Sequence, residues 1–275
     1  MSRGLAGHLD IVCAADSEGR SYLRHQSFRA PIHLSKPHLD EGVLVVNVVN
    51  PTAGLLAGDR IEYRACAENG AALSLTAPSA SRAHRMSTGQ AEVVQNLRVA
   101  RGGWLESWPE LFIPQGGTRF RQSTNIIVEE GGELLFFESL APGRVASGEA
   151  FAFAELVWET DLFVGDAHIV RERYRVVPDD EAVRALRRQF DHAYYASCFA
   201  VSPLFVPELP CWAAINALHG ANVWIGCGAL GHGGWVVKCV ADGSIALRRT
   251  LAAVRRELHA AAGRREPALR RAGFA

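Results

Sequence analysis

The chain lacks any net charge that would draw it to nucleic acid or to an anionic membrane. Its 29 Lys and Arg residues balance 29 Asp and Glu residues, so no global field favours a polyanion. Lysine itself is nearly absent, because only Lys36 and Lys238 occur and the other basic residues in that count are arginines. No apolar run reaches the length that crosses a bilayer. We expect neither a nucleic-acid nor a membrane partner.

The six cysteines of this 275-residue chain include no C-x-x-C pair. Their density is too low for a secreted domain that depends on disulfides. The apolar run near the N-terminus is too short for a signal sequence, and Asp10 and Asp16 flank it. These absences predict a cytoplasmic protein with free thiols.

Several nucleotide-binding and catalytic motifs are also missing. The sequence contains no G-x-x-x-x-G-K-[ST], no G-x-G-x-x-G that follows a strand and opens a helix, no H-E-x-x-H and no G-x-S-x-G. The chain by itself is therefore not expected to hydrolyse a nucleotide or to bind a dinucleotide.

What the sequence does contain is a repeat of about 30 residues. A charged residue, a Gly-containing turn and a strand-like apolar run recur in the same order. Leu73, Leu105 and Leu134 occupy equivalent positions, 32 and 29 residues apart. One such unit cannot bury its own apolar face, so the spacing predicts stacked β units.

Strand signals fill the chain up to residue 177. They include a strand pair over 9–14 and 22–28, and a β-branched strand from Val43 to Val49 that is expected to be buried on both faces. No helical period is convincing in this part of the chain.

The pattern changes near residue 178. Acidic residues at 179–181 cap and begin a helix, and Asp242-Gly243-Ser244 begins a last helix. That last helix places Leu247, Leu251, Val254 and Leu258 on one face. Its arginines, among them Arg255, are expected on a solvated face. The three prolines between residues 201 and 212 argue against a helix there.

Together these patterns predict one domain over residues 1–275, β-rich over 1–177 and mixed over 178–275. The fold class is mainly β: an elongated, β-helix-like stack of short strands with two α-helices in the C-terminal third.

Three polar motifs interrupt the apolar runs. Asn50 to Asp59 (NPTAGLLAGD) is either a Gly-rich connecting loop or a loop that turns Asp59 inward as a carboxylate for a cation. Leu75 to Arg85 (LTAPSASRAHR) is either a surface loop or a polar lining. Glu138 to Glu149 (ESLAPGRVASGE) starts on a buried strand, where Glu138 needs a partner and Arg144 is the expected one.

The C-terminal third scatters cysteines and histidines without a zinc-site spacing. Cys227 and His232, in the Gly-rich GCGALGHGG, could form a nucleophilic pair, although no third group is available to orient the histidine. This is the one enzyme hypothesis that the residues offer.

The ordered set NPTAGLLAGD, LTAPSASRAHR, WLESWPELFIP and ESLAPGRVASGE resembles the urease accessory protein D family (UreD, also called UreH). The resemblance runs from about Phe28 to Val170 and continues weakly to Arg265. It implies an all-β, β-helix-like protein that is not an enzyme. It also implies a complex with urease accessory proteins F and G, of which G is the GTPase, on urease apoprotein.

The resemblance further implies nickel in transit through an interior tunnel, with no tightly bound cofactor. Residues that fall on the family's motifs are then expected to serve the tunnel. The expected metal-path residues are Asp59, Glu138 and Glu149, and the expected lining residues are Thr76, Arg82, His84, Arg85 and Arg144.

The sequence departs from the family pattern at several of these motifs. Ala53-Gly54 and Ala57-Gly58 replace the Gly pairs, Ala77 replaces a Thr, and Leu111 replaces a Glu. The alternative is therefore a divergent paralogue that only docks protein partners through its C-terminal third and has no nickel path.

Overall fold

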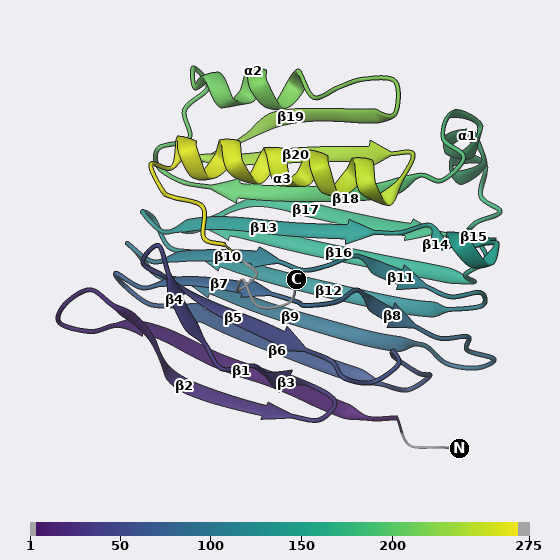
Figure 1. Cartoon of the computed structure of the whole chain (residues 1–275), viewed down its shortest axis with the longest axis horizontal. Helices are drawn as coiled ribbons and strands as arrows, with labels where there is room; N and C mark the ends of the chain where they lie inside the picture. The colour runs from purple at the N-terminus through teal and green to yellow at the C-terminus, as the bar shows by residue number, and fades with distance from the viewer. Residues whose placement is uncertain (1–3, 269–275) are drawn as a thin grey trace.

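The computed structural model describes residues 4–268 and shows three layers (Figure 1). A seven-stranded sheet faces an eleven-stranded sheet, and two helices cover the outer face of the larger sheet. The mainly β fold and its β-solenoid of about four turns confirm the predicted fold class.

Successive turns of the solenoid place strands alternately in the two sheets. The seven-stranded sheet consists, in spatial order, of β17 (Ala167–Val176), β16 (Glu155–Val164), β12 (Arg119–Val128), β9 (Ala91–Val99), β6 (Arg60–Ala67), β1 (Ala6–Ala15) and β2 (Ser21–Arg29). The larger sheet consists of β19 (Val223–Gly231), β20 (Gly234–Ala241), β18 (Tyr194–Val201), β13 (Glu133–Leu140), β10 (Trp104–Trp108), β7 (Ala72–Thr76), β5 (Val43–Val49) and β3 (His33–Leu34).

Short strands complete the rim of the solenoid. β4 (His38–Asp40), β8 (Ser81–Ala83) and β11 (Phe112–Pro114) attach to the larger sheet, and β14 (Gly143–Arg144) pairs with β15 (Glu149–Ala150) around a 3-10 turn, η1 (Val145–Ser147).

The register of the parallel strands confirms the repeat. Leu73 pairs with Leu105, and Leu105 pairs with Leu134. Leu44 extends the same column by one further turn. All four leucines are buried between the sheets, so the 30-residue spacing is the length of one solenoid turn.

Three helices follow residue 178 in the described part of the chain, where the sequence predicted two. α1 (Glu181–Gln189) and α3 (Ser244–Ala261) match the prediction, and α2 (Pro210–Asn216) was missed. α2 begins at the third of the prolines that argued against a helix. A proline at the first helical position is tolerated because its missing N–H has no intrahelical partner there. Among residues 4–268, no helix is both long and apolar enough to span a membrane.

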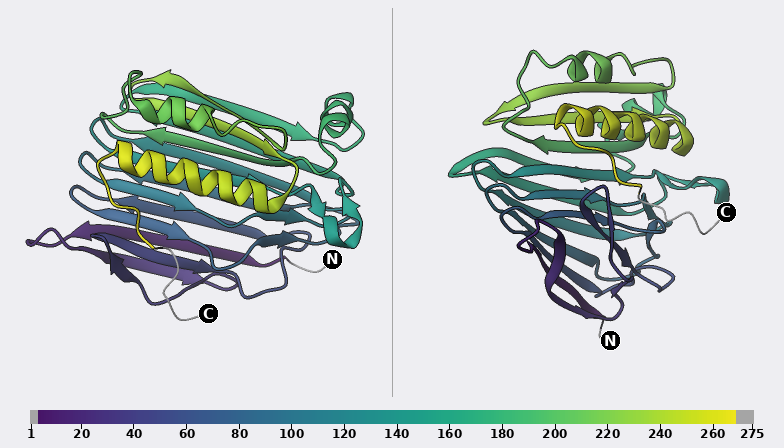
Figure 2. Two further views of the ribbon diagram at one scale, coloured as in Figure 1. Left: turned by 45° about the horizontal axis from the view of Figure 1, so that its top comes forward. Right: turned by 60° about the vertical axis from the view of Figure 1, so that its left-hand side comes forward.

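Two separate cores hold the layers together. One lies between the sheets, and the other lies between the larger sheet and helices α2 and α3. The predicted apolar face of α3 is buried in the second core, but Arg255 of the same helix is buried as well, with 3% exposure. The expectation that Arg255 lies on a solvated face was therefore wrong. Figure 2 shows the segment after α3 descending across the larger sheet toward β4.

Candidate functional site

A cavity of about 480 Å³ lies between the two sheets. Its lining begins at exposed loop residues near Asn50 and Arg82 and continues to the buried side chains of Gln122, Glu138 and Trp158. The inner lining is mainly apolar, with a few polar groups that converge on Glu138. A concave, largely apolar space with a small number of placed polar groups is typical of a binding or transit site.

Glu138 is the carboxylate at the inner end of this cavity. β13 alternates its side chains, so Leu134, Phe136 and Glu138 all face the seven-stranded sheet. The Oε1 atom accepts hydrogen bonds from Gln122 Nε2 at 2.5 Å and from Trp158 Nε1 at 2.7 Å. Both donors contact Oε1, and the described residues form no hydrogen bond with Oε2.

The surroundings of Glu138 raise the pKa of its carboxyl group toward neutral pH. Burial raises the pKa of its carboxyl group to about 7, although hydrogen bonds from Trp158 and Gln122 favour the ionised form and oppose this increase. The negative charge of Glu172 adds to the increase and the positive charge of Lys238 opposes it. Near neutral pH the group therefore changes between an acid and a carboxylate.

Arg144 is not the partner of Glu138, and that expectation was wrong. Arg144 donates from Nε to Glu149 Oε2 at 2.9 Å and from Nη2 to Oε1 at 2.5 Å. Arg144 lies in the short β14 strand, after the chain has left the sheet, so its guanidinium reaches the next strand of the hairpin instead of the interior.

Glu149 forms a second, separate polar cluster at the rim. Its Oε2 also accepts a hydrogen bond from the Gly116 amide at 2.9 Å. The side-chain hydrogen bonds from Arg144 and the Gly116 amide lower the pKa of Glu149 to about 2, and the charge of Arg85 contributes. Two predicted residues, Arg144 and Glu149, thus pair here outside the cavity lining, and the charge of a third, Arg85, acts on Glu149.

Asp59 lies at a third place and holds the backbone. Its Oδ1 accepts from the Leu5 amide and its Oδ2 accepts from the Leu56 amide, both at 2.8 Å. The carboxylate therefore connects the N-terminal segment to the loop before β6. Both oxygens are already engaged in this arrangement.

The remaining predicted lining residues divide between the cavity and the rim. Thr76 and Arg82 line the cavity. The His84 carbonyl accepts a hydrogen bond from Thr118 Oγ1, which fixes the loop between β8 and β9. Among residues 4–268, no three His, Cys, Asp or Glu side chains are grouped as a metal site would require.

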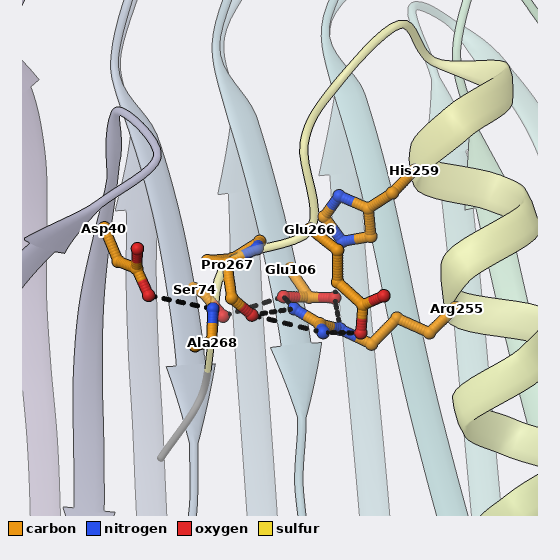
Figure 3. A network of polar contacts seen from close by, with 8 residues as sticks. All are labelled: Asp40, Ser74, Glu106, Arg255, His259, Glu266, Pro267 and Ala268. Carbon is orange, nitrogen blue, oxygen red and sulfur yellow. Dashed lines mark hydrogen bonds and ion pairs between the residues drawn. The ribbon is translucent and has the colours of Figure 1, made fainter. Parts of the chain in front are cut away.

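A buried charge network on the opposite face of the larger sheet was not predicted (Figure 3). Glu106 is fully buried and accepts from Arg255 at 2.5 and 2.8 Å, and from Ser74 Oγ at 2.8 Å. His259 Nε2 lies 3.0 Å from Glu106 Oε1. The Glu266 carboxylate and the Pro267 carbonyl accept from the same guanidinium.

This network is a structural connection between α3, the sheet and the segment after α3. Burial by itself would raise the pKa of Glu106, but hydrogen bonds from His259 and Arg255 outweigh it and hold the pKa at about 2. A signal was available in the sequence: Glu106 lies in an apolar strand, where an acid requires a basic partner. The sequence does not show that this partner is Arg255, which lies 149 residues away.

Cys227 lacks the features of a nucleophile. Its Sγ lies 3.6 Å from the Trp212 carbonyl oxygen, and burial raises the pKa of the thiol. A thiol with a raised pKa is a weaker nucleophile at neutral pH. The structure therefore does not favour the Cys227 and His232 hypothesis.

Comparison with known proteins agrees with the fold and the motifs. The model of the family described as UreD urease accessory protein matches residues 5–273. The chain belongs to the UreD family of urease accessory proteins.

Curated relatives named urease accessory protein UreD cover nearly the same length. The relative from Opitutus terrae is 43% identical over 91% of this chain and 93% of its own. Those from Acetivibrio thermocellus and Mycolicibacterium gilvum are 27% and 28% identical, over 90% and 92% of this chain and 95% and 94% of their own. The family supports a role in urease maturation.

Proposed function

We propose that this UreD chain is a non-catalytic scaffold through which nickel reaches urease apoprotein. In this proposal it acts in the cytoplasm in a complex with accessory proteins F and G, and GTP hydrolysis by protein G drives the process. Nickel is cargo in transit and not a resident cofactor of this chain.

The observation that carries the proposal is the cavity between the sheets with Glu138 at its inner end. A single free carboxylate oxygen beside amide and hydroxyl groups can contact a divalent cation without enclosing it. Such contacts exchange readily, which delivery requires. We therefore expect the isolated chain to bind Ni²⁺ weakly.

The separation of the three acids assigns them different parts in this proposal. Glu138 is the path residue inside the molecule, and Glu149 with Arg144 and Arg85 lies at the rim. Asp59 keeps the loop before β6 in place. We expect substitution of Glu138 to affect nickel delivery most directly.

The test is urease activation by Glu138→Gln. This chain, tagged, is expressed with urease and accessory proteins F and G, and co-purification and nickel-dependent urease activity are measured. Glutamine preserves an oxygen that accepts from Gln122 and Trp158, so we expect a folded chain. We expect activation to fall roughly tenfold, as loss of one charge–cation interaction allows.

Glu130→Gln is the matched control, because Glu130 is an exposed turn residue outside the cavity lining. Unchanged activation by the Glu138 variant would remove the cavity from the nickel path. Binding of the wild-type chain to its partners without any activation would instead support the docking-only paralogue.

A further inference from the structure

A partly exposed ion pair lies beyond the inner end of the cavity. Lys238 Nζ donates to Glu172 Oε1 and, at 2.9 Å, to the Tyr195 hydroxyl. The ammonium also lies 5.0 Å from the centre of the Phe199 ring and 5.6 Å from that of Tyr195. Carboxylate, hydroxyl and ring faces thus surround one compact positive charge.

This ammonium is aligned with Glu138 across the larger sheet. Glu138 pairs with Ser197, and Ser197 pairs with Lys238. Residues directly opposite each other in antiparallel strands share a face, so both side chains point between the sheets. Two strand spacings place their backbones roughly 10 Å apart. Glu172 approaches from β17 of the facing sheet, on the same inward side as Tyr174.

Two carboxylate oxygens in this region lack hydrogen-bond partners among the described residues. Glu172 Oε2 is buried and unpartnered. Glu138, with 6% exposure, uses only Oε1 for its two hydrogen bonds. Of these two oxygens only Glu172 Oε2 is fully buried, so its lack of a donor is unfavourable and a cation is a ligand that would satisfy it.

The ion pair lies outside the cavity lining and is partly exposed to solvent. The Lys238 and Glu172 side chains are 37% and 23% exposed, whereas the cavity lining ends at Glu138 and Trp158. A cation that passed Glu138 along the solenoid axis would meet this ion pair next.

We infer that Lys238 is the counter-cation of Glu172 beyond the inner end of the cavity, and that it is displaced when a divalent cation bridges Glu138 and Glu172. This inference rests on the proposed passage of nickel. Without cargo, the ammonium neutralises Glu172. When the cargo cation binds, it takes the place of the ammonium, and the lysine side chain moves to solvent on its flexible four-carbon stem.

The chemistry of lysine suits this exchange better than that of arginine. An ammonium is a compact point charge on a flexible stem, whereas a guanidinium forms a fixed bidentate pair with a carboxylate. Lysine occurs at only two positions in the chain, and the other ion pairs within residues 4–268 use arginine or histidine. Lys238 is thus the cation most easily exchanged for cargo.

The first test compares Ni²⁺ binding to full-length wild type, Lys238→Met and Lys36→Met by equilibrium dialysis. Removing a positive charge beside two carboxylates should tighten Ni²⁺ binding by about tenfold or more. Lys36 is an exposed loop residue, so its variant should match the wild type. Adding Glu172→Gln to Lys238→Met should abolish the gain. Equal affinities for wild type and Lys238→Met would overturn the inference.

A second measurement does not depend on the folding of a variant. The wild-type chain is treated with an amine-acetylating reagent, with and without Ni²⁺, and the modification of Lys238 and Lys36 is quantified by mass spectrometry. Displacement of the ammonium should increase modification of Lys238 severalfold and leave Lys36 unchanged. Equal modification of Lys238 under both conditions would contradict the inference.

These readouts do not use urease, so they separate the inference from the proposed function. If Glu138→Gln impairs activation but Ni²⁺ leaves Lys238 unaffected, the inference alone fails. If Ni²⁺ displaces Lys238 but Glu138→Gln activates normally, the displacement site stands and the nickel path fails.

Discussion

Two buried glutamates of the larger sheet face opposite sides of it and have opposite electrostatic surroundings. Glu106 faces α3, where Arg255 and His259 hold it ionised with a pKa of about 2. Glu138 faces the seven-stranded sheet, where burial outweighs two neutral donors and raises its pKa to about 7. The guanidinium partner of Glu106 keeps that carboxylate ionised. Glu138 has no guanidinium partner, so its protonation state changes near neutral pH.

Glu106→Gln should therefore reduce stability. It leaves the buried Arg255 guanidinium with only the Glu266 carboxylate and the Pro267 carbonyl as acceptors, and breaking a buried pair costs about 3–5 kcal/mol. Urea denaturation at pH 7 measures the loss. Glu110→Gln is the control, because Glu110 pairs with the exposed Arg248 and should cost less than about 1 kcal/mol. Equal costs for both variants would contradict a central role for the network.

The same carboxylate predicts a pH dependence. The folded-state pKa of Glu106, about 2, lies below the ordinary value of 4.5. The ionised Glu106 carboxylate therefore contributes its full share of the unfolding free energy above the ordinary pKa of 4.5, and this contribution declines as pH falls toward 2. The difference in unfolding free energy between wild type and Glu106→Gln should narrow between pH 5 and about 2. A constant difference over this range would show that Glu106 is not held ionised.

At the scale of elements, the solenoid turn is the unit that organises the structure. Leu44, Leu73, Leu105 and Leu134 stack in register on one sheet, and Ala65, Leu97, Ile126 and Leu162 stack on the other. Each turn buries its apolar residues against its neighbours, so a central turn depends on contacts from both sides.

Leu105→Ala should consequently destabilise the chain by about 2–5 kcal/mol, because it leaves a cavity in the middle of the leucine column. Ile127→Ala is the matched control, since Ile127 lies on β12 with 39% exposure and should change stability by less than about 1 kcal/mol. The comparison requires chemical denaturation of both variants. A cost for Leu105→Ala similar to that of the control would argue against the repeat as the source of stability.

At the scale of the whole molecule, the C-terminal segment ties together parts that are far apart in sequence. After α3, Glu266 and Pro267 contact Arg255, and the Ala268 amide donates to Asp40 in β4. The segment therefore connects the helix layer to the opening turns of the solenoid.

A chain ending at Arg264 should fold less stably, by about 1–3 kcal/mol, because it removes two acceptors from a buried guanidinium. A thermal melt measures this loss, and Arg265→Ala, at a residue whose side chain is 84% exposed, is the control. The docking-only alternative predicts lost partner binding with unchanged stability. Co-purification of the truncated chain with accessory proteins F and G, compared with its melting temperature, distinguishes the two.

The repeat, the strand positions and the apolar face of α3 were all predictable, because each depends on residues close in sequence. The alternation of apolar and polar residues and the 30-residue period show which side chains must be buried. They do not show which other side chains these residues pack against. The same local logic missed α2, where the last of three prolines begins a helix instead of preventing one.

The sequence alone determined the family, through motifs in a fixed order, and the solenoid, through their spacing. Only the tertiary structure decided which charges meet. Arg144 pairs with Glu149, Arg255 with Glu106, and Lys238 with Glu172. The last two pairs join residues 149 and 66 positions apart. Such partners are chosen by how sheets and helices stack, and periodicity along a strand carries no information about the layer that will face it.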